Sequence, residues 1–464
     1  MSFFSKIFNS NKQKPSLTND SITELFIRIA IPSSVGTIFQ TLYNVVDTYF
    51  AGKISAEALS AIAQTFPVFF IIIAMGVGLS IGITALIANA IGEKNDKNAS
   101  YILAQGVILS TLVAIIVTVI GIIVAPYIIT TISKSNTSLS LSLDYLNIIF
   151  LGSIFIFIQM SMNSSLNAIG DTKSYRNVLI FSFFLNIILN PLLIFGYGFI
   201  PAFGIKGIAL STIISQFIGL AYIIYKVSKT YLVNYLYPKC FIPKINILFD
   251  ILKQSLPASF GMMMISVGVF IILYFISQFG DRALAGYGTA IRYEQIFLLP
   301  VLGLNTAVLA MVGQNFGAKK IDRINQIYNK ALYFGCGLMF ICAFLIYFSA
   351  EYAVGLFTDN EEVLKFGTTY LRITCFMEPI YPIFFISNAL IQGIKKPNIV
   401  FLFTVVRMVI LPSIVLWYLI FKMNFSFEYV FWGLLIINWI FGIFVFCVTK
   451  IIIKKEQKKL LSNP

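Results

Sequence analysis

The sequence contains no histidine, and only 11% of its 464 residues are charged. Without histidine it can have no imidazole metal site, no Ser–His or Cys–His nucleophile and no histidine proton relay. Its five cysteines show no CxxC pairing, so we interpret them as small apolar residues. Paired carboxylates at motif spacing are also missing, and we therefore expect that the protein is not an enzyme.

Apolar residues, in contrast, make up 58% of the chain, and the mean hydropathy is +0.88. Stretches of about 20 apolar residues, the length that crosses a hydrocarbon core of roughly 30 Å, recur from one end to the other. This pattern predicts an all-α polytopic membrane protein with twelve transmembrane helices. The expected spans are 24–49, 58–90, 102–130, 144–168, 176–198, 206–226, 252–279, 284–313, 328–350, 366–392, 398–421 and 429–451.

The net charge of +14 is distributed unevenly among the segments between these spans. The N-terminal segment, the segments after even-numbered spans and the tail KKEQKK at 454–459 are basic, whereas the stretch TDNEE at 358–362 on the other side is acidic. By the positive-inside rule, both termini are expected in the cytoplasm of a multi-pass protein of the cell (inner) membrane. The lipid bilayer, and not a nucleic acid, explains the basic excess.

The chain also repeats itself with a constant shift of 225 residues. The motif Pro32-Ser-Ser-Val-Gly36 matches Pro257-Ala-Ser-Phe-Gly261, and YLNI at 145–148 matches YLRI at 370–373. Each half has six predicted spans, an even number, so both halves enter the membrane from the same side as parallel repeats.

This repeat predicts three parts. They are an N-terminal six-helix bundle at 1–226, a cytoplasmic linker at 227–251, and a C-terminal six-helix bundle with a basic tail at 252–464. Two similar bundles around a central cavity are typical of a carrier that works by alternating access. A channel would more usually repeat around a pore as an oligomer, so we expect a monomer.

Three segments resemble the MATE (multidrug and toxic compound extrusion) family, bacterial type, over nearly the whole chain. They are PSSVGTIFQTLYNVVDTYFAGKISAEALSAI, ALAGYGTAIRYEQIFLLPVLGLNTAVLAMVGQNFGAKK and LFTDNEEVLKFGTTYLRI. The resemblance implies an antiporter that exports small organic compounds, cationic or amphiphilic, coupled to entry of Na⁺ or H⁺ and needing no other cofactor. The alternative is a flippase for lipid-linked precursors or lipids from the same superfamily, although such proteins usually have more spans.

The resemblance also implies a coupling site at Asp47, which interrupts the otherwise uncharged first span. Asn186 and Asn190, four residues apart on one helical face, and Thr212 would complete it. Some members have an aspartate where this chain has Asn190. Carboxylate and amide oxygens suit Na⁺, with Asp47, Asn186 and Asn190 as ligands, but a buried carboxylate can equally carry a proton. The alternative role for both asparagines is to cross-link helices.

The second half has no acid at the position equivalent to Asp47, which is Ile272. Its candidates are Glu294, about 15 Å into its helix, and Glu378, which precedes Pro379 and Pro382 in a helix that these prolines should break. Arg292 lies two residues before Glu294 and is expected on a different face. The structural alternative for Glu294 is an ion pair with Arg372 or Arg407.

Overall fold

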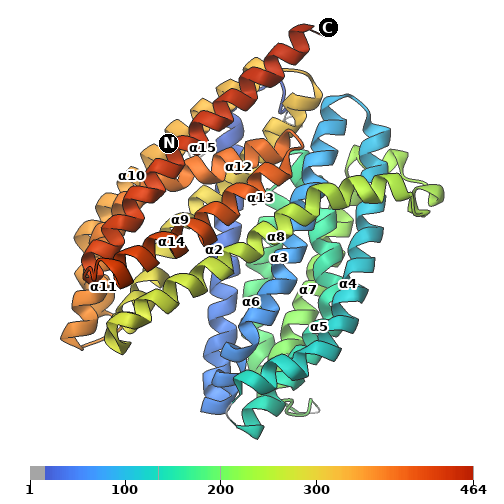
Figure 1. Cartoon of the computed structure of the whole chain (residues 1–464). Helices are drawn as coiled ribbons and strands as arrows, with labels where there is room; N and C mark the ends of the chain where they lie inside the picture. The colour runs from blue at the N-terminus through green and yellow to red at the C-terminus, as the bar shows by residue number, and fades with distance from the viewer. Residues whose placement is uncertain (1–15, 134, 199, 463–464) are drawn as a thin grey trace, which may run out of the picture. The chain divides into compact units, whose positions relative to one another are not determined.

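All regular elements of the described residues are helices (Figure 1). A computed structural model describes residues 16–133, 135–198 and 200–462. The basic segment before residue 16, used above to predict the orientation, lies outside this range. The helices of the first half are α2 (Ile22–Ile54), α3 (Ala56–Gly92), α4 (Asp96–Ile132), α5 (Asn136–Ala168), α6 (Lys173–Phe195) and α7 (Ile205–Ser228).

The second half begins with the short 3₁₀ turns η1 (Tyr231–Tyr235) and η2 (Pro238–Phe241). Its helical elements are α8 (Ile245–Ile276), η3 (Ser277–Phe279), α9 (Asp281–Gly317), α10 (Ile321–Gly355), α11 (Glu361–Thr374), η4 (Cys375–Ile380), α12 (Tyr381–Gly393), α13 (Pro397–Val405), η5 (Val406–Ile410), α14 (Leu411–Trp417), η6 (Tyr418–Lys422) and α15 (Phe427–Ser462). Joined where they are continuous, these elements give twelve apolar spans within the described residues, which confirms the predicted number.

Polar side chains at the helix starts explain where several spans begin. Ser55, Asn95 and Ser135 each accept a hydrogen bond from the backbone N–H three residues later, at 3.1, 3.0 and 3.1 Å. Each of these bonds satisfies one of the N–H groups that the first turn of a helix leaves free. These polar residues between the spans therefore act as N-caps that start the next helix.

The sequence repeat has a counterpart in the backbone. Lys94 and Lys319, which are 225 residues apart, both have φ of 57°, in the left-handed region that few non-glycine residues adopt. Gly170 and Lys395, again 225 residues apart, have φ of 81° and 61°. The two halves therefore end corresponding helices with the same unusual backbone turn.

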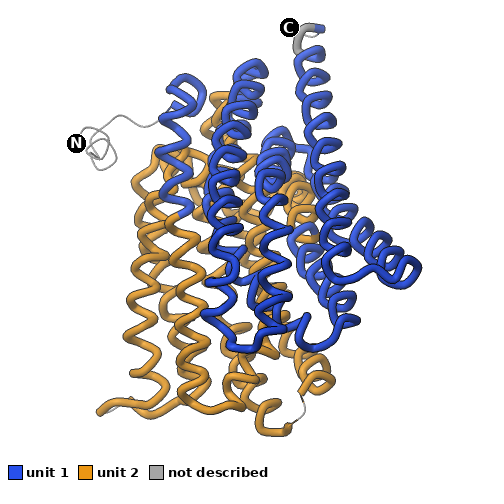
Figure 2. Tube along the Cα trace, turned by 90° about the vertical axis from the view of Figure 1, so that its left-hand side faces the viewer, with its two compact units in different colours: residues 1–34, 261–464 blue, residues 35–260 orange. Residues whose placement is uncertain are grey.

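The chain forms two compact units, shown in Figure 2. One consists of residues 1–34 and 261–464, and the other of residues 35–260. Both α2 and α8 are therefore divided: the first part of each helix belongs to one unit and its continuation to the other. The division into halves at 227–251, which follows the sequence repeat, stays a prediction.

Matched serine–glycine contacts hold the first parts of α2 and α8. Within residues 35–260, the hydroxyl of Ser259 donates to the carbonyl of Met75 at 3.3 Å, and Gly78 packs directly against Ser259. Within the other unit, Ser34 donates to the carbonyl of Pro300 at 3.2 Å, and Gly303 packs against Ser34. All three positions correspond under the 225-residue shift. Glycine lets the helix backbones approach closely at both places.

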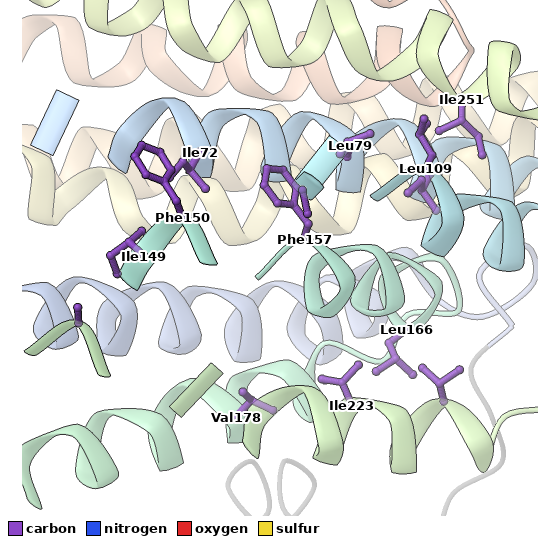
Figure 3. Close-up of a cluster of buried hydrophobic side chains, with 14 of the residues drawn as sticks. Ile72, Leu79, Leu109, Ile149, Phe150, Phe157, Leu166, Val178, Ile223 and Ile251 are labelled. Atoms are coloured by element: carbon purple, nitrogen blue, oxygen red, sulfur yellow. The ribbon is translucent and has the colours of Figure 1, made fainter. Parts of the chain in front are cut away.

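The core of the unit at 35–260 is built around α5, which packs against α3, α4 and α7. Phe150 and Phe157 of α5 face Ile72 and Leu79 of α3 in Figure 3, and all four are buried. These large side chains lie on the sides of α3 and α5 that face each other. The other sides of these helices are therefore free to present polar groups.

The connection after α7 is fixed to α4 by hydrogen bonds. The Gln105 side chain donates to the carbonyls of Cys240 and Ile242 at 2.7 and 2.8 Å and accepts from the backbone N–H of Lys244 at 2.8 Å. The hydroxyl of Ser100 donates to the carbonyl of Leu232 at 2.6 Å. This connection is therefore an ordered part of the unit that contains α4, and it sets where α8 begins.

We predict that Gly303→Ala destabilises the protein, because the new methyl group would overlap Ser34 and the carbonyl of Ala30. Overpacking of this kind costs about 1–3 kcal/mol. Gly288→Ala in the same helix is the control, because a Cβ at Gly288 meets no atom within 4 Å. Thermal unfolding of the purified protein in detergent should show a lower midpoint for Gly303→Ala only; equal midpoints for the two variants would contradict the proposed packing.

Candidate functional site

Asp47 lies in the part of α2 that belongs to the unit at 35–260, and its side chain is 8% exposed. It faces α6 and α7, which approach α2 closely enough for side-chain hydrogen bonds. A carboxylate in a membrane-spanning helix is costly to bury, so its partners must come from the protein.

Three side chains donate hydrogen bonds to this carboxylate. The amide nitrogens of Asn186 and Asn190 both reach Asp47 Oδ1, at 2.9 and 3.0 Å. The hydroxyl of Thr212 reaches Asp47 Oδ2 at 3.3 Å. The structure thus brings together all four residues that were predicted to form the coupling site, from three different helices.

The spacing of the two asparagines explains how α6 can supply two donors. Residues four apart lie on one face of a helix, and both Asn186 and Asn190 are fully buried. Asn190 also donates to Asn186 Oδ1 at 3.1 Å, and Asn186 donates to the hydroxyl of Ser211 at 3.2 Å. The amides are therefore held in place by one another and by α7.

Further polar groups surround this network, and the sequence analysis missed them. Tyr43, one turn before Asp47, has a buried hydroxyl that lies among Thr212, Ser215 and Asn186. Ser211 adjoins Thr212, and Ser215 follows Ser211 by four residues on the same face of α7. Tyr43 precedes Asp47 by four residues and Ser215 follows Thr212 by three, and these helical spacings are the signal that could have identified them.

Three buried oxygens beside the carboxylate have no hydrogen-bond partner among the described residues: Asn190 Oδ1, Tyr43 Oη and Ser215 Oγ. No group of three or more histidine, cysteine or acidic side chains gathers in the described part of the chain to hold a metal. A cation at Asp47 would therefore be held by one carboxylate and neutral oxygens. Such a set fits a small hard cation such as Na⁺, and the carboxylate alone suffices for a proton.

In the other unit, Glu294 on α9 is buried and accepts two hydrogen bonds. The hydroxyl of Tyr370 donates to Glu294 Oε2 at 2.5 Å, and the hydroxyl of Tyr381 donates to Glu294 Oε1 at 3.1 Å. Neither Arg372, which pairs with Glu351 at 3.4 Å, nor Arg407 pairs with Glu294. The ion-pair alternative is wrong for this structure, because tyrosine hydroxyls take the place that a cation was expected to fill.

The remaining second-half candidates lie apart from this hydrogen-bonded group. Arg292 is exposed on a different face of α9, as expected from its spacing. Glu378 is fully buried in η4, the 3₁₀ turn between α11 and α12, which confirms the predicted break in this helix. Neither carboxylate oxygen of Glu378 has a hydrogen-bond partner within the described residues. The charges of Glu378 and Glu294 lie close enough to interact.

Comparison with known proteins places this geometry in context. The chain is 27% identical over 380 residues to the "Probable multidrug resistance protein YpnP" of Bacillus subtilis, covering 81% of this chain and 83% of that protein. It is 25% identical over 415 residues to an "FAD transporter" of Shewanella oneidensis, covering 86% and 88%. Relatives of similar identity thus carry names that refer to different cargo.

The fold matches a solved structure described as the "Outward-facing conformation of a multidrug resistance MATE family transporter of the MOP superfamily". The TM-score is 0.89, with 23% sequence identity, and the match covers 97% of this chain and 99% of the other. The family model MatE matches residues 32–192 and 257–419, more than half of the chain and both repeats. The chain therefore belongs to the MatE family of membrane transporters for multidrug efflux.

Proposed function

We propose that this protein is an antiporter that exports small organic compounds, cationic or amphiphilic, coupled to the entry of Na⁺ or H⁺. The observation that carries the proposal is the buried Asp47 carboxylate with three donors and three unpartnered oxygens around it. A site of one charge and several neutral ligands can be switched by a single monovalent cation. Asn186, Asn190 and Thr212 would serve as its ligands and positioning groups.

Neutralisation of Asp47 by a proton or Na⁺ would change its hydrogen bonds. The amides of Asn186 and Asn190 would no longer face a negative charge, and they could release the carboxyl group while keeping their present hydrogen bonds to one another and to Ser211. The packing of α6 and α7 against α2 would shift in response, and substrate would be released outward. Operation in the cell (inner) membrane as a monomer, with both termini in the cytoplasm, belongs to the same proposal.

Nothing in the structure or in the comparisons favours the alternative of a flippase for lipid-linked precursors. The described residues provide twelve spans, and the relatives named above are a multidrug resistance protein and an FAD transporter. The antiporter is therefore the function to test.

We predict that Asp47→Asn abolishes gradient-driven export of a fluorescent lipophilic cation from proteoliposomes. The substitution removes the charge but keeps the shape, so the cation loses its only anionic ligand. An imposed Na⁺ gradient and an imposed pH gradient should be compared, because only the coupling ion will drive export by the unsubstituted protein.

Asp144→Asn is the matched control, because Asp144 is 38% exposed and pairs with Lys206 at 3.2 Å near the start of α5. It should transport normally. If Asp47→Asn still exports the dye under the effective gradient, or if neither gradient moves dye in any variant, the antiporter proposal is wrong for this chain.

A second proposal concerns Glu294 and Glu378. We propose that this pair of carboxylates takes part in transport in the second unit, because Glu378 is fully buried and its carboxylate oxygens accept no hydrogen bond from the described residues, an arrangement that is costly in a membrane span. Glu294, with two tyrosine donors, would be the member that is charged in the present arrangement. Arg292, exposed on another face, is not needed for this pair.

We predict that Glu294→Gln brings transport close to background while the thermal unfolding midpoint changes little, because the amide oxygen can accept from one tyrosine and the amide nitrogen can donate to the hydroxyl oxygen of the other. Glu351→Gln, which changes the charge of an exposed residue paired with Arg372, is the control. A Glu294→Gln variant that transports normally, or one that loses stability and transport together, would assign Glu294 a structural role.

A further inference from the structure

Arg407 lies far inside a membrane span and forms no ion pair with an acidic side chain of the described residues. It stands ten residues after the first residue of the span Pro397–Lys422, about 15 Å along the axis. The side chain is half-buried. An ionised side chain at this depth is costly, and such residues usually serve a function. Arg407 has no part in the cation coupling proposed above.

The side chain is held in a defined orientation. Its Nε donates to Asn438 Oδ1 at 3.1 Å, and Asn438 in turn donates to the carbonyl of Leu434 at 2.9 Å. The guanidinium lies 3.8 Å from the ring centroid of Phe384 and 5.1 Å from that of Tyr381. Two aromatic rings and one amide therefore fix the plane of the guanidinium.

No acidic side chain of the described residues forms an ion pair with the Arg407 guanidinium. The ion pairs formed within the described residues involve other lysines and arginines, and Glu294 is bonded to Tyr370 and Tyr381 instead. Among the described residues, only Nε of Arg407 has a hydrogen-bond partner, and its two Nη atoms are not among the enclosed polar atoms. The guanidinium therefore lacks an anionic partner there, while its Nη donors remain accessible.

The local helix geometry adds an independent observation. Residues Val406–Ile410 form η5, a π-helical segment between α13 and α14. Such segments are rare and frequently mark functional sites, because the widened turn changes where its side chains point. This span contains two π-helical segments, η5 and η6 (Tyr418–Lys422), and η5 carries the arginine.

From these features we propose that Arg407 binds the anionic group, a carboxylate or a phosphate, of an aromatic or amphiphilic compound. The free Nη edge of a guanidinium matches two oxygens of such a group, and the neighbouring rings provide an apolar surface for the body of the compound. This binding proposal depends on the proposed function in one respect: it treats the bound compound as cargo that the protein exports. The same chemistry would also bind the phosphate of a membrane lipid.

The test is equilibrium binding to the purified full-length protein in nanodiscs of phosphatidylcholine, without any ion gradient. The probes are 1-naphthoate and 1-naphthylmethylammonium, which share a ring system and differ in charge, and binding is followed by quenching of tryptophan fluorescence. We expect saturable binding of the anion, weakened about tenfold or more by Arg407→Gln. Arg407→Lys should bind with intermediate affinity, because it keeps the charge and loses the two-point contact.

Arg372→Gln, an exposed arginine in the same unit, should bind 1-naphthoate like the unsubstituted protein. The binding measurement uses no ion gradient, so a failure of cation coupling leaves this result standing. Competition by added phosphatidylglycerol would assign the anionic group to lipid, and lack of competition would assign it to a soluble compound. Equal binding of both probes, or unchanged binding in folded Arg407→Gln and Arg407→Lys, would overturn the proposal.

Discussion

The hydrogen bonds to Asp47 are the interaction on which the account of this protein depends. Water cannot satisfy a carboxylate inside a membrane span, so α6 and α7 supply three donors to it. Each donor lies on a different turn or helix, and their geometry is right only while the three helices keep their present packing. The charge state of one side chain is thereby tied to the arrangement of three helices.

The helix that carries Asp47, α2, belongs to both compact units. Its first part, up to Ser34, packs in the unit that contains α9, and the part that carries Asp47 packs with α6 and α7. The same division occurs in α8, with Ser259 in the place of Ser34. The two units are therefore joined covalently through α2 and α8. The matched serine–glycine contacts show that both repeats were built with this connection.

Much of the fold followed from the sequence because its signals are local or repeated. Apolar run lengths predicted the twelve spans, and the prolines after Glu378 predicted the broken helix. The four-residue spacing of Asn186 and Asn190 was enough to place both on one face. For Thr212 the resemblance to a family was needed, because one hydroxyl in an apolar helix has no distinctive pattern.

What the sequence could not show depends on contacts between distant segments. The tyrosine partners of Glu294 lie 76 and 87 residues away, and no spacing rule connects them. The ion pair with an arginine, which was the structural alternative for Glu294, considered charge alone, whereas a tyrosine hydroxyl can satisfy a carboxylate without a second buried charge. The division of α2 and α8 between the two units was likewise invisible, since a repeat shows which segments correspond but not what each one packs against.

The two units also differ in chemistry. Asp47 is surrounded by donors and neutral oxygens, whereas Arg407 is surrounded by aromatic rings and an amide. The two repeats keep the same backbone turns. They nevertheless differ in charge at these two sites, with a carboxylate in one and a guanidinium in the other. Under the proposals above, one unit would respond to a cation while the other contacts cargo.

The most direct test of the central claim is cation binding to purified protein at equilibrium, without any gradient. Binding of ²²Na⁺ and proton release on addition of an organic cation would be measured for the unsubstituted protein and for Asp47→Asn. The account predicts saturable Na⁺ binding, or a titrating group that exchanges its proton on addition of an organic cation, and loss of that signal in Asp47→Asn. A signal that survives in Asp47→Asn would show that the coupling cation binds elsewhere.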